Sequence, residues 1–113
     1  MTGIHEVNEG DVLRLLGWHD GDESVTGAVL MFTPLCGTCK IAERMLEIVA
    51  ATTVAVEITK LNINYAPRLR EEWRISSVPC LVLLRNGRPV RFEYAMRSVD
   101  HLYELLKSLE SAG

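Results

Sequence analysis

A cysteine pair, Cys36 and Cys39, stands between a short apolar run and a helical pattern, and this junction restricts the possible folds more than any other feature of the sequence. The run from Ala28 to Phe32 is apolar at every position, as in a strand that is buried on both faces of a sheet. The positions that recur at helical spacing after the cysteines, and that we expect to form the buried face of a helix, are Ile41, Met45, Ile48 and Val49. The charged side chains of the opposite, solvent-facing side are Lys40, Glu43, Arg44 and Glu47. A buried strand that leads directly into an amphipathic helix predicts an α/β fold.

Strand and helix signals alternate along the rest of the chain. Asn8 can cap a helix, Asn86-Gly87 is a turn signal between two strands, and Ser98 can cap the last helix. The other predicted strands are Ile4 to Val7, Val54 to Ile63, Leu81 to Leu84 and Val90 to Tyr94, and the other predicted helices are Glu9 to Leu16, Pro67 to Trp73 and a segment after Ser98 with Leu102, Leu105, Leu106 and Leu109 as its apolar stripe. The order β-α-β-α-β-α-β-β-α predicts one α/β domain, residues 1–113, with a central mixed β-sheet and helices on both faces.

Composition and charge argue against several classes of function. The formal net charge is −3 and no cluster of lysine and arginine is present, so we expect no nucleic acid partner. No apolar run approaches the roughly 20 residues that cross a bilayer, so we expect no membrane association. The start of the chain lacks the pattern of a secretory signal, and three cysteines leave one without a partner in a disulfide framework. We therefore expect a cytoplasmic protein, and a monomer, whose cysteines have a redox or metal-binding role.

The two cysteines of the Cys36-Gly-Thr-Cys39 motif occupy different chemical positions. At the start of a helix, free backbone N–H groups and the positive end of the helix dipole favour a thiolate, so Cys36 is predicted to be the nucleophile. Cys39 lies three residues further along the same helix, near enough for a disulfide and less exposed, so it is predicted to be the resolving thiol. Gly37 would let the backbone turn tightly beside a substrate, and Thr38 would leave that turn less rigid than proline would.

Four landmarks around this motif resemble the thioredoxin family in order and spacing, over nearly the whole chain. They are Phe32-Thr-Pro-Leu-Cys-Gly-Thr-Cys-Lys40, Lys60-Leu-Asn-Ile63, Val78-Pro79 and Asn86-Gly87. The resemblance implies a thioredoxin fold with a cis peptide bond before Pro79, and a thiol–disulfide oxidoreductase that reduces protein disulfides without a cofactor other than its redox-active disulfide. It also implies disulfide-containing client proteins and a thioredoxin-reductase-type electron donor as partners. The implied substrate groove, in which the backbone of Val78 pairs with the client, consists of Phe32, Leu35, Gly37, Thr38, Ser77, Val78 and Pro79.

Two positions beside the motif depart from the family pattern. Leu30 stands where typical thioredoxins have a buried aspartate that manages the proton of the resolving cysteine, so we expect slower resolution by Cys39. Lys60 resembles the usual partner of that aspartate and is a candidate accessory residue, but the aspartate is missing. Glu57 is three positions away, on the opposite side of a strand, and cannot easily replace it.

Two other functions are compatible with the same residues. A binding module could hold zinc or an iron–sulfur cluster through the thiolates of Cys36, Cys39 and Cys80, because metal sites also use the C-x-x-C spacing. No second C-x-x-C is present and the histidines have no ligand spacing, so we expect no metal. A thioredoxin-like interaction module without enzymatic activity is the other class, and the retained cysteines argue against it. For Cys80, a small buried residue that starts a central strand is a simpler interpretation than a redox role.

Overall fold

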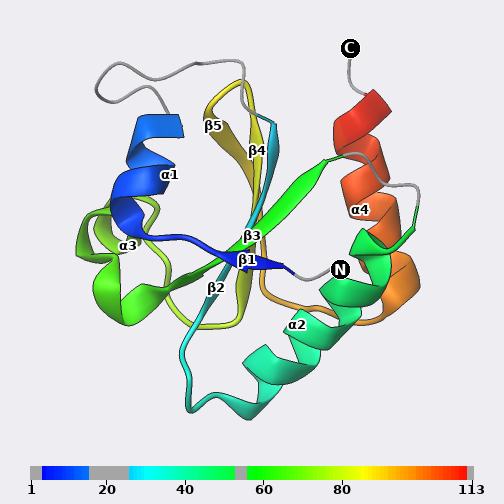
Figure 1. Ribbon diagram of the computed structural model, residues 1–113, viewed down its shortest axis with the longest axis horizontal. Helices are drawn as coiled ribbons and strands as arrows, with labels where there is room; N and C mark the ends of the chain where they lie inside the picture. The colour runs from blue at the N-terminus through cyan, green and yellow to red at the C-terminus, as the bar shows by residue number, and fades with distance from the viewer. Residues whose placement is uncertain (1–3, 16–25, 53–55, 112–113) are drawn as a thin grey trace.

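A mixed sheet of five strands forms the middle layer of the protein (Figure 1). The computed structural model describes residues 4–15, 26–52 and 56–111. The strands are ordered β1-β3-β2-β4-β5 across the sheet and comprise β1 (His5–Glu6), β2 (Gly27–Phe32), β3 (Glu57–Asn62), β4 (Cys80–Arg85) and β5 (Arg88–Glu93). The first three strands are parallel, whereas β4 runs antiparallel to β2 and to β5.

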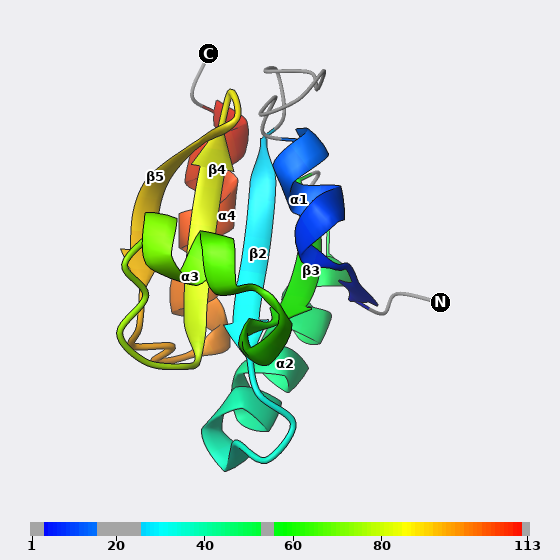
Figure 2. The same cartoon turned by 90° about the vertical axis from the view of Figure 1, so that its left-hand side faces the viewer.

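Helices cover both faces of this sheet (Figure 2). One face carries α1 (Glu9–Leu15) and α3 (Pro67–Glu72), which follows a short 3-10 turn, η1 (Ile63–Tyr65), and the other face carries α2 (Gly37–Ala50) and α4 (Val99–Ser111). The predicted order of strands and helices is confirmed. The predicted end of the first helix, Leu16, and the start of the predicted third strand, Val54, lie outside the described residues. Within the described ranges, no helix is long and apolar enough to cross a membrane.

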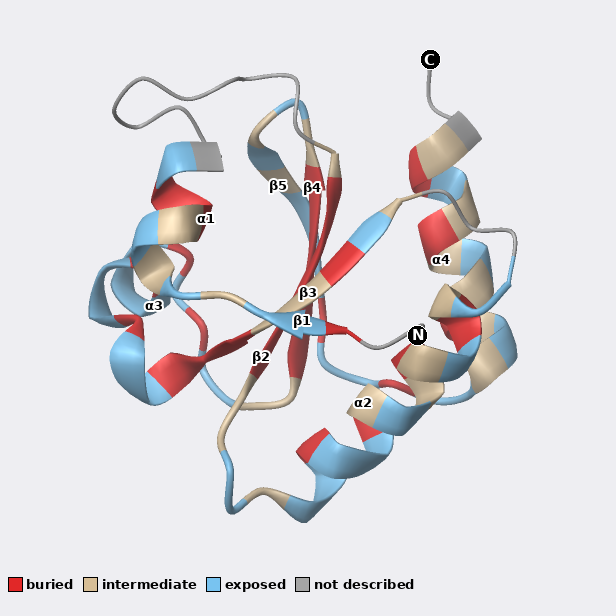
Figure 3. Ribbon diagram, viewed as in Figure 1, coloured by how far each residue is buried: buried red, intermediate tan, exposed pale blue. Residues whose placement is uncertain are grey.

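The strand β2 is buried on both faces, as its sequence predicts (Figure 3). Val29 and Met31 pack in the core under α1 and α3, whereas Ala28 and Leu30 pack in the core under α2 and α4. Because successive side chains of a strand point to opposite faces, one apolar run supplies both cores. The position of β2 between β3 and β4 therefore determines where the segment after Phe32 leaves the sheet.

Local signals in the sequence determine how the elements begin and turn. The side chain of Asn8 accepts a hydrogen bond from the backbone N–H of Asp11 at 2.8 Å, and Ser98 accepts one from His101 at 3.1 Å, so both predicted caps are confirmed. Asn86 and Gly87 have φ angles of 55° and 77°. This left-handed pair is the turn of the predicted hairpin, which joins β4 to β5.

The helix α2 buries a face that overlaps only in part with the predicted one: Val49 is buried as predicted and Met45 is partly buried against the core. Its buried residues are Cys39, Ala42, Leu46 and Val49. Ile41 and Ile48 are 58% and 55% exposed, so the prediction that they face the core is wrong. The two apolar stripes are offset by one residue, about 100° around the helix axis. Because Cys39 is turned inward, Ala42 and Leu46 follow it into the core and Ile41 is left at the surface.

Truncation of one side chain on each stripe tests which face of α2 stabilises the fold. Leu46→Ala should lower the free energy of unfolding by about 2–5 kcal/mol, because it empties a fully buried site. Ile48→Ala, on the exposed stripe of the same helix, should change it by no more than about 0.5 kcal/mol. Urea unfolding of both variants measures this difference, and equal losses would show that the outer stripe also packs in the core.

Candidate active site

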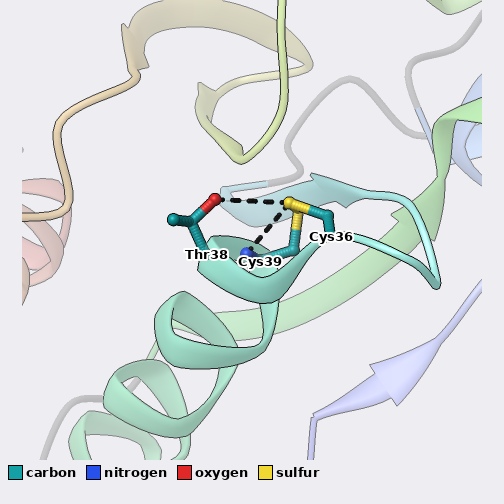
Figure 4. Close-up of a disulfide and its surroundings, with 3 residues drawn as sticks. All are labelled: Cys36, Thr38 and Cys39. Atoms are coloured by element: carbon teal, nitrogen blue, oxygen red, sulfur yellow. Dashed lines mark hydrogen bonds between the residues drawn. A yellow bond between two sulfur atoms is a disulfide. The ribbon is translucent and has the colours of Figure 1, made fainter.

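A disulfide joins Cys36 and Cys39 at the start of α2 (Figure 4). The Cα atoms of the two cysteines are 5.2 Å apart. Cys36 is the N-cap residue of the helix, with an extended backbone (φ −101°, ψ 111°), and it is partly exposed. Cys39 lies one turn into the helix and is only 2% exposed. The end of β2 and the helix start therefore place one sulfur near solvent and the other inside.

The surroundings of the Cys36 sulfur suit a negative charge. The backbone N–H of Cys39 donates a hydrogen bond to Cys36 Sγ at 3.1 Å, and Thr38 Oγ1 lies 3.3 Å from the same atom. Both groups can donate to a thiolate, and the positive end of the helix dipole acts in the same direction. After reduction, this site favours the thiolate form of Cys36, the form that attacks disulfides.

The loop before β4 lies against the cysteine motif, although it is 40 residues further along the chain. The peptide bond between Val78 and Pro79 is cis, as the resemblance implies. Pro79 and Thr38 together line a hollow of about 320 Å³ on the surface. The other residues that line it are Ile41, Ala42, Met45, Tyr94 and Met96. This apolar hollow begins at Thr38, the residue that contacts the Cys36 sulfur.

The other predicted groove residues differ in their surroundings. Leu35 is 98% exposed beside the disulfide, Ser77 is exposed, and Val78 is partly buried against the core under α1 and α3. The backbone of Gly37 is not left-handed. A Cβ atom at Gly37 would meet no atom within 4 Å. The space beside Cys36 is therefore left open by the free protein.

Lys60 has a partner that sequence reasoning missed. Its Nζ atom lies 2.6 Å from Glu43 Oε2 of α2, and the side chains are 20% and 25% exposed. The same Nζ lies 5.4 Å from the centre of the Phe32 ring. The prediction that Glu43 faces solvent is wrong, because α2 is rotated relative to the predicted face. One signal could have revealed it: Glu43 is four residues after Cys39 and therefore borders the same side of the helix.

Cys80 is a free thiol enclosed in the core. It starts β4, is fully buried, and belongs to the core under α1 and α3. Burial raises the pKa of the Cys80 thiol to about 11, which the hydrogen bond with Tyr94 only partly offsets, and the charge of Glu93 acts in the same direction as burial. Among the described residues, no three histidine, cysteine, aspartate or glutamate side chains are grouped so that they could hold a metal ion. The geometry favours a structural role for Cys80.

The reactivity of Cys80 tests this assignment. In a Cys36→Ser/Cys39→Ser double variant, the remaining thiol should be alkylated at neutral pH roughly a hundredfold more slowly than an ordinary cysteine, the factor that two pKa units give. The same protein unfolded in urea should react at the ordinary rate. Mass spectrometry of timed iodoacetamide reactions measures both rates, and rapid labelling of the folded variant would contradict a buried, protonated thiol.

Comparisons with known proteins agree with this geometry. The family model described as Thioredoxin matches residues 22–108. A thioredoxin-like protein of Bacillus subtilis, YusE, is 40% identical over 83 residues, which cover 74% of this chain and 78% of that protein. A thioredoxin of Chlamydia muridarum is 36% identical over 87 residues, which cover 75% of this chain and 85% of that protein.

Solved structures show the same fold at lower sequence identity. A mutant thioredoxin of Halobacterium salinarum superimposes with a TM-score of 0.81 at 20% identity, over 99% of this chain and 95% of that one. Thioredoxin f of spinach chloroplast has a TM-score of 0.79 at 24% identity, over 97% of this chain and 88% of that one. With the family match over most of its length and a cysteine pair at disulfide distance, the chain belongs to the thioredoxin family and is a thiol–disulfide oxidoreductase.

Proposed function

We propose that this protein reduces disulfides in client proteins through a cycle of the Cys36 and Cys39 thiols. One observation carries the assignment of roles: Cys36 Sγ accepts a hydrogen bond from the Cys39 N–H at the start of α2, whereas Cys39 is buried. The partly exposed, hydrogen-bonded sulfur is the nucleophile, and the enclosed sulfur resolves the intermediate.

The cycle has two exchange steps. The Cys36 thiolate attacks one sulfur of the client disulfide, and the bonding electron pair leaves on the other client sulfur, which takes a proton from solvent. Cys39 then loses its proton and attacks Cys36 Sγ, so that the second client sulfur leaves with the electron pair and is protonated in turn. The client gains two electrons and two protons, and the protein becomes the disulfide.

The hollow beside Thr38 supports binding of clients through an apolar side chain next to their cysteine. It lies between the cysteine motif and the Pro79 loop, and Ile41 and Met45 of α2 form one wall. Its volume of about 320 Å³ is at the small end of ligand pockets, which suits a side chain better than a cofactor. Leu35, directly before the reactive cysteine, is exposed, and Gly37, directly after it, leaves open space, so both residues are available to a client.

The remaining parts of the proposal concern the source of electrons and the compartment. A protein that returns to the dithiol after each turnover needs a donor, for which we propose a thioredoxin-reductase-type enzyme. Cytosolic glutathione and reductase systems hold dithiols reduced, so the proposed location is the cytoplasm. The odd number of cysteines supports this, because Cys80 is a buried thiol rather than half of a structural disulfide.

Cysteine substitutions test the cycle. Cys36→Ser should abolish reduction of a protein disulfide, because the attacking thiolate is lost, whereas Cys39→Ser should accumulate a mixed disulfide between Cys36 and the client. Cys80→Ala is the matched control and should retain activity. Reduction of insulin by the dithiol-charged protein, followed with non-reducing gels, measures all three, and a mixed disulfide trapped on Cys39 instead would reverse the assigned roles.

Two equivalent surface isoleucines test the client site. Ile41→Glu, in the wall of the hollow, should raise the KM for a protein client about fivefold, because roughly 1 kcal/mol of apolar contact is lost. Ile48→Glu makes the same change two turns further along the exposed stripe and should leave KM unaltered. Rates with a small disulfide that lacks a peptide should stay equal in all proteins. Equal KM values for the two variants would place the client elsewhere.

A further inference from the structure

The second step of the cycle requires a proton to leave a buried thiol. Cys39 is only 2% exposed. Leu30 of β2, which is paired with Lys60 of β3 in the sheet, is fully buried. Apolar surroundings disfavour a thiolate, yet the thiolate is the attacking form. A charged or basic group near Cys39 would therefore control the rate of this step.

Few charged groups face this end of α2 in the described part of the chain. Strand β2 carries no titratable side chain, Lys40 is exposed, and β1 contributes His5 and Glu6, both exposed. On α4, which packs along α2, His101 is bonded to Glu93, Lys107 is bonded to Glu110, and Asp100 and Glu104 are exposed. Arg44 of α2 and Glu57 of β3 are exposed as well. Glu43 of α2 and Lys60 of β3 are both partly buried and are paired with each other.

Glu43 and Lys60 are held beside Cys39 by the helix and the sheet. Residues four apart in a helix have Cβ atoms about 5–6 Å apart on one side, so Glu43 and Cys39 are neighbours on the surface of α2. Lys60 is the register partner of Leu30, so both side chains point to the α2 face of the sheet. Its ammonium group binds Glu43 Oε2 at 2.6 Å.

We propose that Glu43 is the proton acceptor for Cys39 and that Lys60 is the residue that positions it, which rests on the proposed dithiol cycle. Lys60 holds Oε2, and Oε1 receives the proton of the Cys39 thiol as the sulfur attacks Cys36 Sγ. The bond between Cys36 and the client sulfur breaks, and the electron pair leaves with the client. Glu43 then returns the proton to solvent, to which a quarter of its side chain is exposed.

An ion pair that served only for stability would be a weak reason for this arrangement. Pairs that are partly open to water contribute about 0–1 kcal/mol, and many contribute nothing measurable. Glu43 lies one turn from a thiol that must ionise, on the side of the helix that borders the sheet. This position gives the ion pair a role in proton transfer.

A two-phase thiol titration separates the proposal from the function on which it rests. When the reduced protein meets excess dithio-bis-nitrobenzoate, attack by Cys36 releases one coloured thiolate and resolution by Cys39 releases the second. Stopped-flow absorbance resolves the two phases over a range of pH. The variants are Glu43→Gln, which keeps the shape and removes the base, Lys60→Met, which removes the positioning charge, and Glu47→Gln, which makes the same charge change one turn further along α2.

The second phase of Glu43→Gln should be about a hundredfold slower at neutral pH, the low end of what a general base contributes, and should approach the parent rate as pH rises and hydroxide replaces the base. Lys60→Met should slow the same phase with the same pH trend, and Glu47→Gln should match the parent.

The first phase should be equal in all four proteins, and urea midpoints establish that each is folded. An unchanged or faster second phase in Glu43→Gln and Lys60→Met would overturn the proposal, because a carboxylate that merely repelled the thiolate would slow resolution when present. Loss of the first phase in the parent protein would instead overturn the dithiol cycle.

Discussion

The junction between β2 and α2 is the constraint on which the rest of the protein depends. Because β2 is buried on both faces in the middle of the sheet, packing in both cores determines where the strand ends at Phe32. Four residues later Cys36 is the N-cap of the helix, which begins at Gly37. The N–H of Cys39 and the hydroxyl of Thr38 are then placed at the Cys36 sulfur without any dedicated catalytic loop. The burial of β2 therefore determines the position of the reactive Cys36 sulfur.

The three cysteines have the same side chain but differ in reactivity because they lie in different environments. Cys36 is partly exposed at a helix start, Cys39 is enclosed one turn later, and Cys80 is buried in the opposite core. The first position stabilises a thiolate, the second keeps a thiol near its partner, and the third raises the pKa of the thiol to about 11 by desolvation. Cys80 nevertheless follows directly after Pro79, which lines the same hollow as Thr38 of the cysteine motif.

The rotation of α2 accounts for both the proposed client surface and the proposed proton acceptor. Because Cys39 and Leu46 face the core, Ile41 faces outward, where it lines the hollow beside Thr38. The same rotation brings Glu43 from the solvent side to the edge of the sheet, where it meets Lys60. One helical orientation therefore supplies an apolar surface next to the nucleophile and a carboxylate next to the resolving thiol.

The sequence by itself determined the order of strands and helices, the caps at Asn8 and Ser98, the Asn86-Gly87 turn and the redox motif, because each depends on neighbouring residues or on a regular spacing. Only the tertiary structure decided which of two apolar stripes of α2 is buried, since both have helical spacing and the choice depends on what the sheet and α4 offer. It also decided the partner of Lys60. Glu43 and Lys60 are 17 residues apart in different elements, and no local pattern relates them. Contacts between elements depend on the relative rotation of those elements, which packing sets and local sequence does not.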